Sequence, residues 1–344
     1  MASSSHFVRL LLEAEERFIP LEISLELTHR CNFSCEHCYI PDHALADGIA
    51  PPRLLSLLEE LAELGTLFIT MTGGEVFARR DWHQIASRAR ELGFSLRLFS
   101  NGALIDESVA DRVKALAAAV EVSLYSMKPE VFERITRQEG SLGRTLRGIE
   151  LLRERGVEVK IKVPIMTHNL GQEREVLEYA RRVGAGFASD PRILHRKDGD
   201  TEPTHLQVDQ GDLICYYRDP SSEYVSPEEC AAKPHREDGI LCAAGIRLAN
   251  ITASGDVMAC NVLPGSAGNV NRQPFREIWE GSPWFARLRS IRRRDLHVCG
   301  TCTKFSYCRR CFAQALVQGG DLLGPAPWSC QHAAAIEEAY QGDS

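Results

Sequence analysis

Three cysteines near the start of the chain, Cys31, Cys35 and Cys38, constrain what it can fold into more than any other feature. They follow residues 21–27, where leucine and isoleucine alternate with polar residues, a pattern typical of a β-strand with two different faces. A cubane iron–sulfur cluster is normally held by four cysteines, so three leave one iron free to bind another group. The triplet therefore indicates a fold that gathers three thiols at a strand end, around a cluster that can serve as a reaction centre.

The other cysteines mark a second region of the chain. Cys215 and Cys230 lie between the two groups, residues 39–214 contain no cysteine, and the second group is Cys242, Cys260, Cys299, Cys302, Cys308, Cys311 and Cys330. The sequence has neither an apolar run of signal-peptide length near its start nor about 18 uninterrupted apolar residues. We therefore expect a cytoplasmic protein, because spaced cysteines in a reducing compartment bind metal more often than they form disulfides. The net charge of −7 argues against nucleic-acid or anionic-membrane partners.

Short β patterns alternate with amphipathic helical patterns between residues 21 and 190. Strands are expected at 21–27, 67–71, 95–99, 120–125, 157–165 and 186–189, and helices at 53–64, 82–92, 107–116, 144–155 and 172–183. Repeated βα units imply a parallel sheet covered by helices. Six units are too few for a closed eight-stranded barrel, so we expect an α/β fold, a partial (β/α)6 TIM-like barrel over residues 1–190.

The polar faces of these strands predict what lies inside the barrel. Because helices must cover the apolar face, the opposite face, with Glu26, Ser123, Lys160 and Lys162, should line a wet lumen. A sheet with one solvent-exposed face would give the same alternation, but parallel connections favour the lumen. Residues 191–241 lack clear periodicity and are expected to bridge to a cysteine-rich region, 242–344, which ends in a helix near 331–340.

The first cysteine group resembles the cluster motif of the radical S-adenosylmethionine (SAM) superfamily, and the likeness extends over residues 21–190. Gly73-Gly74-Glu75, after the second strand, is similar to the glycine-rich motif that receives the SAM amino group, because glycines allow close backbone approach. The resemblance implies further cofactor contacts at His37, Tyr39, Ser100, Asn101, Ser123, Arg137 and Lys162. The family often has glycine where Arg137 stands, and it often has asparagine at the position of Asn169. A zinc site completed by His29 or His37 is the alternative.

The resemblance also implies a mechanism. SAM would chelate the open iron of a [4Fe–4S] cluster, and one electron would cleave it to methionine and a 5′-deoxyadenosyl radical that abstracts hydrogen from the substrate. Such chemistry belongs to the cofactors, whereas the protein supplies orientation and excludes water. An electron donor such as flavodoxin or ferredoxin is therefore an expected partner.

The second cysteine group resembles the SPASM extension of the same superfamily, whose full members hold two auxiliary clusters, expected here as [4Fe–4S]. The family's interleaved pattern implies a proximal cluster on Cys242, Cys260 and Cys311 and a distal one on Cys299, Cys302, Cys308 and Cys330. Only two residues separate Cys308 from Cys311, where three are usual, and Leu248 stands where sulfatase-maturing enzymes have a cysteine. The proximal cluster is expected either to take Cys230 or Cys215 as its fourth ligand, with Cys230 favoured, or to keep an open iron. A zinc ribbon is the alternative for this region.

The substrate is the least constrained part of the prediction. Many SPASM enzymes modify ribosomally made peptides by crosslinking, epimerisation or oxidation, and we expect a peptide here. The first strand begins near residue 21, so a separate peptide-recognition protein is the expected partner. Small-molecule chemistry, such as tetrapyrrole side-chain decarboxylation or sugar and antibiotic modification, is the alternative. A non-catalytic iron–sulfur electron carrier is the third hypothesis, which the complete triplet and Gly73–Glu75 disfavour. Cys215 is a candidate hydrogen-atom donor, although an ordinary buried cysteine is more common.

Overall fold

The computed structural model describes residues 2–219, 222 and 239–341, and its centre is a nine-stranded sheet in the order β6-β5-β4-β3-β2-β1-β7-β8-β9. Strands β1 to β6 are parallel and lie side by side in chain order. This arrangement confirms the α/β fold class. The strands are β1 (Glu22–Thr28), β2 (Phe68–Gly73), β3 (Ser95–Ser100), β4 (Ala119–Ser123), β5 (Val159–Pro164), β6 (Gly186–Asp190), β7 (Leu248–Ile251), β8 (Asp256–Met258) and β9 (Ser266–Asn269).

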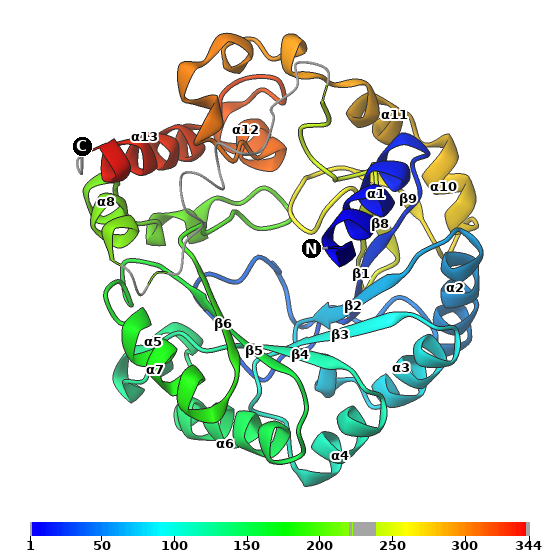
Figure 1. Cartoon of the computed structure of the whole chain (residues 1–344). Helices are drawn as coiled ribbons and strands as arrows, with labels where there is room; N and C mark the ends of the chain where they lie inside the picture. Colours follow the sequence, from blue (N-terminus) through cyan, green and yellow to red (C-terminus); the bar gives the residue numbers. More distant parts are fainter. Residues whose placement is uncertain (1, 220–221, 223–238, 342–344) are drawn as a thin grey trace.

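Helices cover the outside of the arch that β1 to β6 form (Figure 1). Those between the strands are α2 (Pro51–Glu63), α3 (Trp82–Glu91), α4 (Glu107–Ala115), α5 (Pro129–Thr136), α6 (Ser141–Glu154) and α7 (Glu173–Val183). The later helices lie beyond the two ends of this arch and complete the circle that it begins. They are α8 (Gln210–Arg218), α10 (Phe275–Gly281), α11 (Pro283–Ser290), α12 (Phe312–Gly319) and α13 (Pro327–Gln341). Short 3₁₀ helices are η1 (Val76–Ala78), η2 (Glu202–Leu206), η4 (Arg293–Asp295), η5 (Cys299–Thr301) and η6 (Thr303–Ser306).

The sheet extends beyond the six strands expected from the sequence. Strand β7 pairs in parallel with β1, with Glu22 opposite Leu248, and β8 and β9 continue the sheet in antiparallel fashion. The pairing covers the backbone edge of β1, which would otherwise present unpaired N–H and C=O groups. The cysteine-rich region is therefore joined to the barrel through the same sheet that carries the cysteine triplet at its strand ends.

Six α-helices among the described residues were not predicted from the sequence, and three of them, α10, α11 and α12, lie in the cysteine-rich region. Helix α1 (Ala2–Glu16) precedes the first strand, α5 lies between β4 and α6, and α8 lies within the segment expected to lack regular structure. Helix α5 begins with Pro129, because the fixed φ of proline suits the first helical position. Helix α8 follows Asp209, whose side chain accepts a hydrogen bond from the Asp212 N–H. Each of these two has fewer than ten residues, too short for a clear helical period.

The interior face of the sheet is polar as expected, but Glu26 is not part of a wet surface. Ser123, Lys160 and Lys162 are half-buried, whereas Glu26 is 1% exposed. Its carboxylate forms an ion pair with Lys197, from the segment after β6, and accepts a 3.0 Å hydrogen bond from the Asn250 side chain on β7. The added strands and the segment after β6 therefore close over this part of the lumen. No helix in the described residues is long and apolar enough to cross a bilayer.

Candidate active site

The three cysteines of the N-terminal triplet line one cavity of about 160 Å³ at the carboxyl ends of β1 to β4. Parallel strands bring their carboxyl ends to one edge of the sheet, so residues that follow different strands meet there. Of the cofactor residues predicted from the sequence, seven line this cavity: His37, Tyr39, Gly73, Gly74, Ser100, Asn101 and Ser123. Glu75, Arg137 and Lys162 do not line it.

The thiols of the triplet are in an environment that suits a highly charged metal centre. Burial raises the pKa of Cys31 to about 11 and raises that of Cys35 further. Nearby Cys31 and Cys38 add to the shift at Cys35, because three negative charges in one place repel each other. Cysteine binds iron as the deprotonated thiolate. The positive charge of the iron would therefore compensate the negative charge of three thiolates that lie close together. The donor set therefore fits an iron–sulfur cluster held by three thiolates.

Glu75 does not line the cavity, but it binds two residues that do. Its carboxylate accepts hydrogen bonds from the Ser100 hydroxyl at 2.8 Å and the Asn101 N–H at 2.7 Å. The Asn101 side-chain amide in turn lies 3.7 Å from the sulfur of Cys31 and donates to Asn32 at 2.8 Å. Burial raises the pKa of Glu75 to about 7, although these hydrogen bonds act in the opposite direction. In this structure Glu75 thus orients the residues beside Cys31 rather than lining the cavity.

The two glycines of the motif are required by close backbone contacts. A Cβ on Gly73 would lie 2.3 Å from the Thr28 carbonyl oxygen, and one on Gly74 would lie 2.4 Å from the carbonyl oxygens of His29 and Arg30. Gly73 also has a φ of +135°, which side chains disfavour. The Gly74 N–H donates to Thr28 at 2.9 Å, so the glycines clamp the end of β2 onto the segment that leads into the cysteine triplet.

The two predicted cationic contacts have other partners. Arg137 is 55% exposed and lies 3.8 Å from Glu36, which also contacts His168 at 3.0 Å. Lys162 lies 3.3 Å from Glu121, which has Arg97 at the same distance on its other side. Both cations are neutralised outside the cavity in this structure.

His37 and Tyr39 flank the third cysteine and are partly buried in the barrel interior. Burial lowers the pKa of His37 to about 4, so its ring is neutral, and it packs edge-on against Tyr125 at 4.9 Å between ring centroids. Hydrogen bonds join the Tyr39 side chain to Thr72 and Asn261. Because Asn261 directly follows Cys260, this contact links the first cysteine group to the second.

His43 also lines the cavity and was missed from the sequence. Its Nε2 atom lies 3.5 Å from the sulfur of Cys38, and its Nδ1 atom lies 2.8 Å from the His29 carbonyl oxygen. In the sequence, His43 stands five residues after Cys38, outside the Cys31–Cys38 motif, so no spacing marks it as part of the site.

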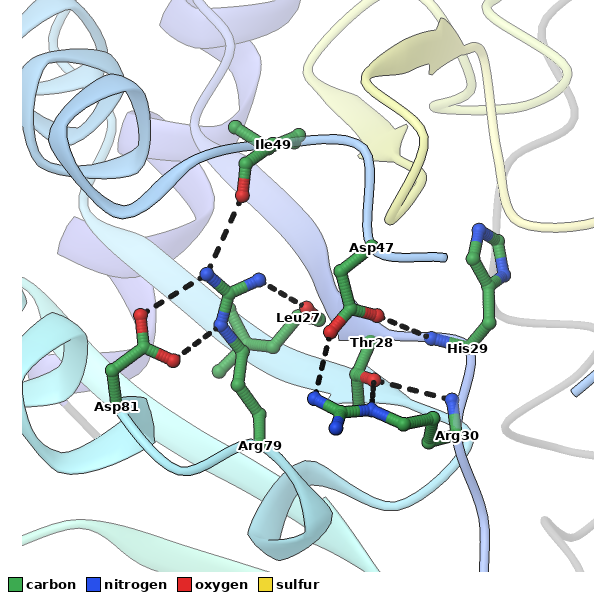
Figure 2. A network of polar contacts seen from close by, with 8 residues as sticks. All are labelled: Leu27, Thr28, His29, Arg30, Asp47, Ile49, Arg79 and Asp81. Atoms are coloured by element: carbon green, nitrogen blue, oxygen red, sulfur yellow. Dashed lines mark hydrogen bonds and ion pairs between the residues drawn. The ribbon is translucent and has the colours of Figure 1, made fainter. Parts of the chain in front are cut away.

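A polar network fastens the loop that follows the cysteines to the end of β1 (Figure 2). The buried Arg79 guanidinium donates to the Leu27 carbonyl at 2.7 Å and the Ile49 carbonyl at 3.4 Å, and it makes two hydrogen bonds to Asp81. Asp47 accepts hydrogen bonds from the His29 N–H at 3.2 Å and from Arg30 at 2.9 Å. The cluster loop is thereby held on the carboxyl side of the sheet.

The later cysteines fall into two groups in space. The thiolate charges of Cys242 and Cys311 add to the burial that raises the pKa of Cys260 to about 12. Burial likewise raises the pKa of Cys308 to about 12, and here the added charges are those of Cys330, Cys299 and Cys302. These are the two sets that the interleaved pattern implies. Cys230 lies outside the described residues. Cys215 is exposed on α8 and lines neither the cavity of the cysteine triplet nor a second cavity of about 510 Å³.

A second cavity of about 510 Å³ occupies the lumen. Phe99, on the interior face of β3, lines both this cavity and that of the cysteine triplet. Cys260 and Asn261 also line the large cavity, as do Phe7 of α1 and Asn250 of β7. The lumen therefore borders the first cysteine group through Phe99 and the second through Cys260.

Comparisons with known proteins agree with this geometry. Residues 25–182 match the radical SAM superfamily, and residues 242–312 match SPASM, an iron–sulfur cluster-binding domain. The chain is 27% identical to the AdoMet-dependent heme synthase of Methanosarcina barkeri, over 90% of this chain and 96% of that protein. It is 28% identical to the PqqA peptide cyclase of Gluconobacter oxydans, over 94% and 96% respectively.

Solved structures show the same fold. Streptococcus suis SuiB bound to its precursor peptide SuiA superposes with a TM-score of 0.72 at 16% identity, over 95% of this chain and 80% of that one. Native anSMEcpe with bound AdoMet gives 0.71 at 17% identity, over 94% and 98%. With both domains matched in the expected order, the chain belongs to the radical SAM superfamily, among the members with a C-terminal SPASM domain.

Proposed function

We propose that this protein is an enzyme that cleaves SAM reductively at Cys31, Cys35 and Cys38 and abstracts hydrogen from a ribosomally made peptide. The observation that carries the proposal is the common wall formed by Phe99 between the cavity of the cysteine triplet and the 510 Å³ lumen. A substrate in the lumen would lie beside a cofactor in the smaller cavity, as hydrogen abstraction requires reacting atoms in near contact.

The residues around the smaller cavity have distinct parts in this reaction. Cys31, Cys35 and Cys38 would hold the cluster, and Gly73, Gly74 and Ser123 would contact SAM. When bound, the cluster and SAM supply the electron and the 5′-deoxyadenosyl radical. The amino group of SAM donates hydrogen bonds, so backbone carbonyl oxygens of the glycine segment, and not its N–H groups, would receive it. The buried Tyr125 ring and the partly buried His37 ring, which pack edge-on, shield one wall from water.

The composition of the large cavity favours a peptide. Asn261 is partly exposed and presents a carboxamide, which can both donate to and accept from a peptide backbone. Asn250 is 1% exposed and donates to Glu26, so it supports the wall of the cavity from behind. Phe7 and Phe99 offer aromatic surface to an apolar side chain. The PqqA peptide cyclases and peptide-bound SuiB among the similar proteins support the same substrate class.

The second cysteine group would serve this reaction as two auxiliary clusters. Cys260 lines the lumen, so a proximal cluster on Cys242, Cys260 and Cys311 would border the substrate. Cys299, Cys302, Cys308 and Cys330 would hold the distal cluster. A flavodoxin or ferredoxin would supply electrons, and a separate recognition protein would present the peptide.

Tetrapyrrole side-chain decarboxylation is a second candidate function. The AdoMet-dependent heme synthase of Methanosarcina barkeri aligns over 96% of its own length, so the two chains differ little in extent. Arg97 also lines the lumen and is 52% exposed, which would suit a substrate carboxylate.

Anaerobic reconstitution tests the proposal. With iron, sulfide, SAM and a reductant, the protein should release 5′-deoxyadenosine. Changing Cys31, Cys35 and Cys38 to alanine should abolish this release. The variant should still hold about 8 iron atoms if two auxiliary cubanes are present. Crosslinking or oxidation would change the mass of an added precursor peptide, and epimerisation in D₂O would introduce deuterium, whereas decarboxylation of a porphyrin propionate would release carbon dioxide. A fully loaded protein that forms no 5′-deoxyadenosine would point instead to an electron carrier.

A further inference from the structure

The His43 ring lies between a cluster cysteine and the backbone that follows β1. Its Nδ1 atom is 2.8 Å from the His29 carbonyl oxygen, and its Nε2 atom is 3.5 Å from the sulfur of Cys38. The ring is half-buried and lines the cavity of the cysteine triplet, together with the motif glycines that the proposed function assigns to SAM. The function proposed above gives His43 no part.

Hydrogen-bond chemistry constrains what this ring can do. A carbonyl oxygen only accepts, so Nδ1 must carry the hydrogen that His29 receives. Nε2 faces the Cys38 sulfur, which carries negative charge and no hydrogen once it binds iron. A lone pair facing that sulfur would be repelled, whereas an N–H would form a charge-assisted hydrogen bond. Both observed contacts are therefore attractive in the assembled site only when each ring nitrogen carries a hydrogen, that is, when His43 is an imidazolium that donates from Nε2 to the negatively charged sulfur.

The fold, and not the ring alone, sets this position. Asp47 holds the same loop to the backbone of His29 and the side chain of Arg30, and Arg79 reaches the Ile49 carbonyl (Figure 2). On the other side, the Gly48 N–H donates to the Ala253 carbonyl at 2.8 Å. The loop is fastened at Asp47, Gly48 and Ile49, so the segment that carries the ring is held by contacts that do not involve His43.

We propose that His43 is a positioning residue that donates a hydrogen bond from Nε2 to the Cys38 sulfur and makes the first cluster easier to reduce. Hydrogen bonds to cluster sulfurs are among the factors that set reduction potential, because they stabilise the more negative, reduced state. The inference rests on the proposed function only in that it requires a cluster at Cys31, Cys35 and Cys38. It does not depend on which substrate the lumen takes.

An EPR-monitored redox titration of the reconstituted full-length protein, without SAM or substrate, tests this role. A Cys38→Ser variant identifies the spectral component of the first cluster. In His43→Leu, which cannot donate, the ratio of reduced to oxidised first cluster at a fixed potential should fall about tenfold, the change expected for losing a hydrogen bond to a charged group. In His43→Gln the side-chain N–H should preserve most of the ratio. His205→Gln, at an exposed position, should leave every component unchanged.

Two results would overturn the proposal. The first is a His43→Leu protein with full iron content and an unchanged first-cluster component. The second is a hyperfine coupling from ¹⁵N-labelled histidine in the wild type that is large enough for an iron-bound nitrogen, or absent altogether. A weak coupling supports the N–H···S contact, so the labelled wild type decides even if the leucine variant loses iron. A wild type that binds no iron at the triplet would instead contradict the proposed function.

Discussion

The carboxylate of Glu75 accepts a 2.7 Å hydrogen bond from the backbone N–H of Asn101, which joins the end of β2 to the end of β3 beneath the cysteine triplet. Ser100 donates to the same carboxylate at 2.8 Å, and the Asn101 side chain reaches the sulfur of Cys31. Two motifs that are separated by 25 residues in sequence therefore act as one structural unit. A change at Glu75 should reach Cys31 through Asn101.

Glu75 should make the folded state less stable as the pH rises from about 4.5 to about 7. Burial raises the pKa of this carboxyl to about 7 from an ordinary value of 4.5. Between these values the folded protein retains a proton that the unfolded chain has released, so stability present at low pH is lost as pH increases. The loss should be at most about 3.5 kcal/mol, since each pKa unit of this difference corresponds to about 1.4 kcal/mol.

Urea denaturation of the cluster-free chain between pH 4.5 and 8 checks this prediction. The Glu75→Gln variant should lack that part of the slope, because glutamine does not titrate in this range. Exposed Glu63→Gln is the matched control and should retain the wild-type slope. Equal slopes for wild type and Glu75→Gln would contradict the prediction.

Gly74→Ala should disrupt the cluster loop. The added Cβ would lie 2.4 Å from two backbone carbonyl oxygens, and backbone cannot move aside as a flexible side chain can. We expect a loss of several kcal/mol in the free energy of unfolding and reduced iron at the triplet. Gly143→Ala is the control, since its Cβ meets nothing within 4 Å on helix α6 and should stabilise by about 0.5–1 kcal/mol. Denaturation and iron analysis of both variants would measure this, and equal stability of the two would refute the steric argument.

The residues best predicted from the sequence are those that follow parallel strands. Cys31, Gly73, Asn101 and Ser123 come at or after the ends of four successive strands, so the topology alone brings them to one edge of the sheet. Charge alone gives no comparable guide to position. Arg137 and Lys162 pair with Glu36 and Glu121, partners that no sequence pattern revealed, and their assignment to a SAM carboxylate stays a prediction.

Contacts made by loops could not be predicted for a different reason. His43 reaches Cys38 only because the loop folds back through Asp47, and that path depends on long-range contacts. The pairing of β7 with β1 also joins residues more than 200 positions apart, and the alternation within either strand does not specify a partner. The same pairing explains why Glu26, expected in a wet lumen, is buried.

Arg79 should be essential for the stability of the cluster loop. Its side chain is 5% exposed, pairs with Asp81 and donates to the Leu27 and Ile49 carbonyls. Arg79→Ala would leave these acceptors and a carboxylate without a partner, so we expect a loss of about 3–5 kcal/mol in the free energy of unfolding. Arg79→Lys should recover only part, because an ammonium cannot reproduce the forked geometry. Arg88→Ala, which removes an exposed ion pair with Glu59, is the control and should leave the denaturation midpoint nearly unchanged.

The spatial grouping of the later cysteines predicts which substitutions affect the same cluster. Cys260→Ala and Cys311→Ala should alter one EPR component, and Cys302→Ala and Cys308→Ala a different one, because each pair lies in a separate electrostatic group. Each variant should lose up to about 4 iron atoms from its own cluster, the content of one cubane, while the other component persists. Exposed Cys215→Ala is the control and should keep all the iron. Loss of both components in a Cys308→Ala protein that remains folded by circular dichroism would show that the two groups form one metal centre, because independent clusters have no shared ligand through which one substitution could remove both.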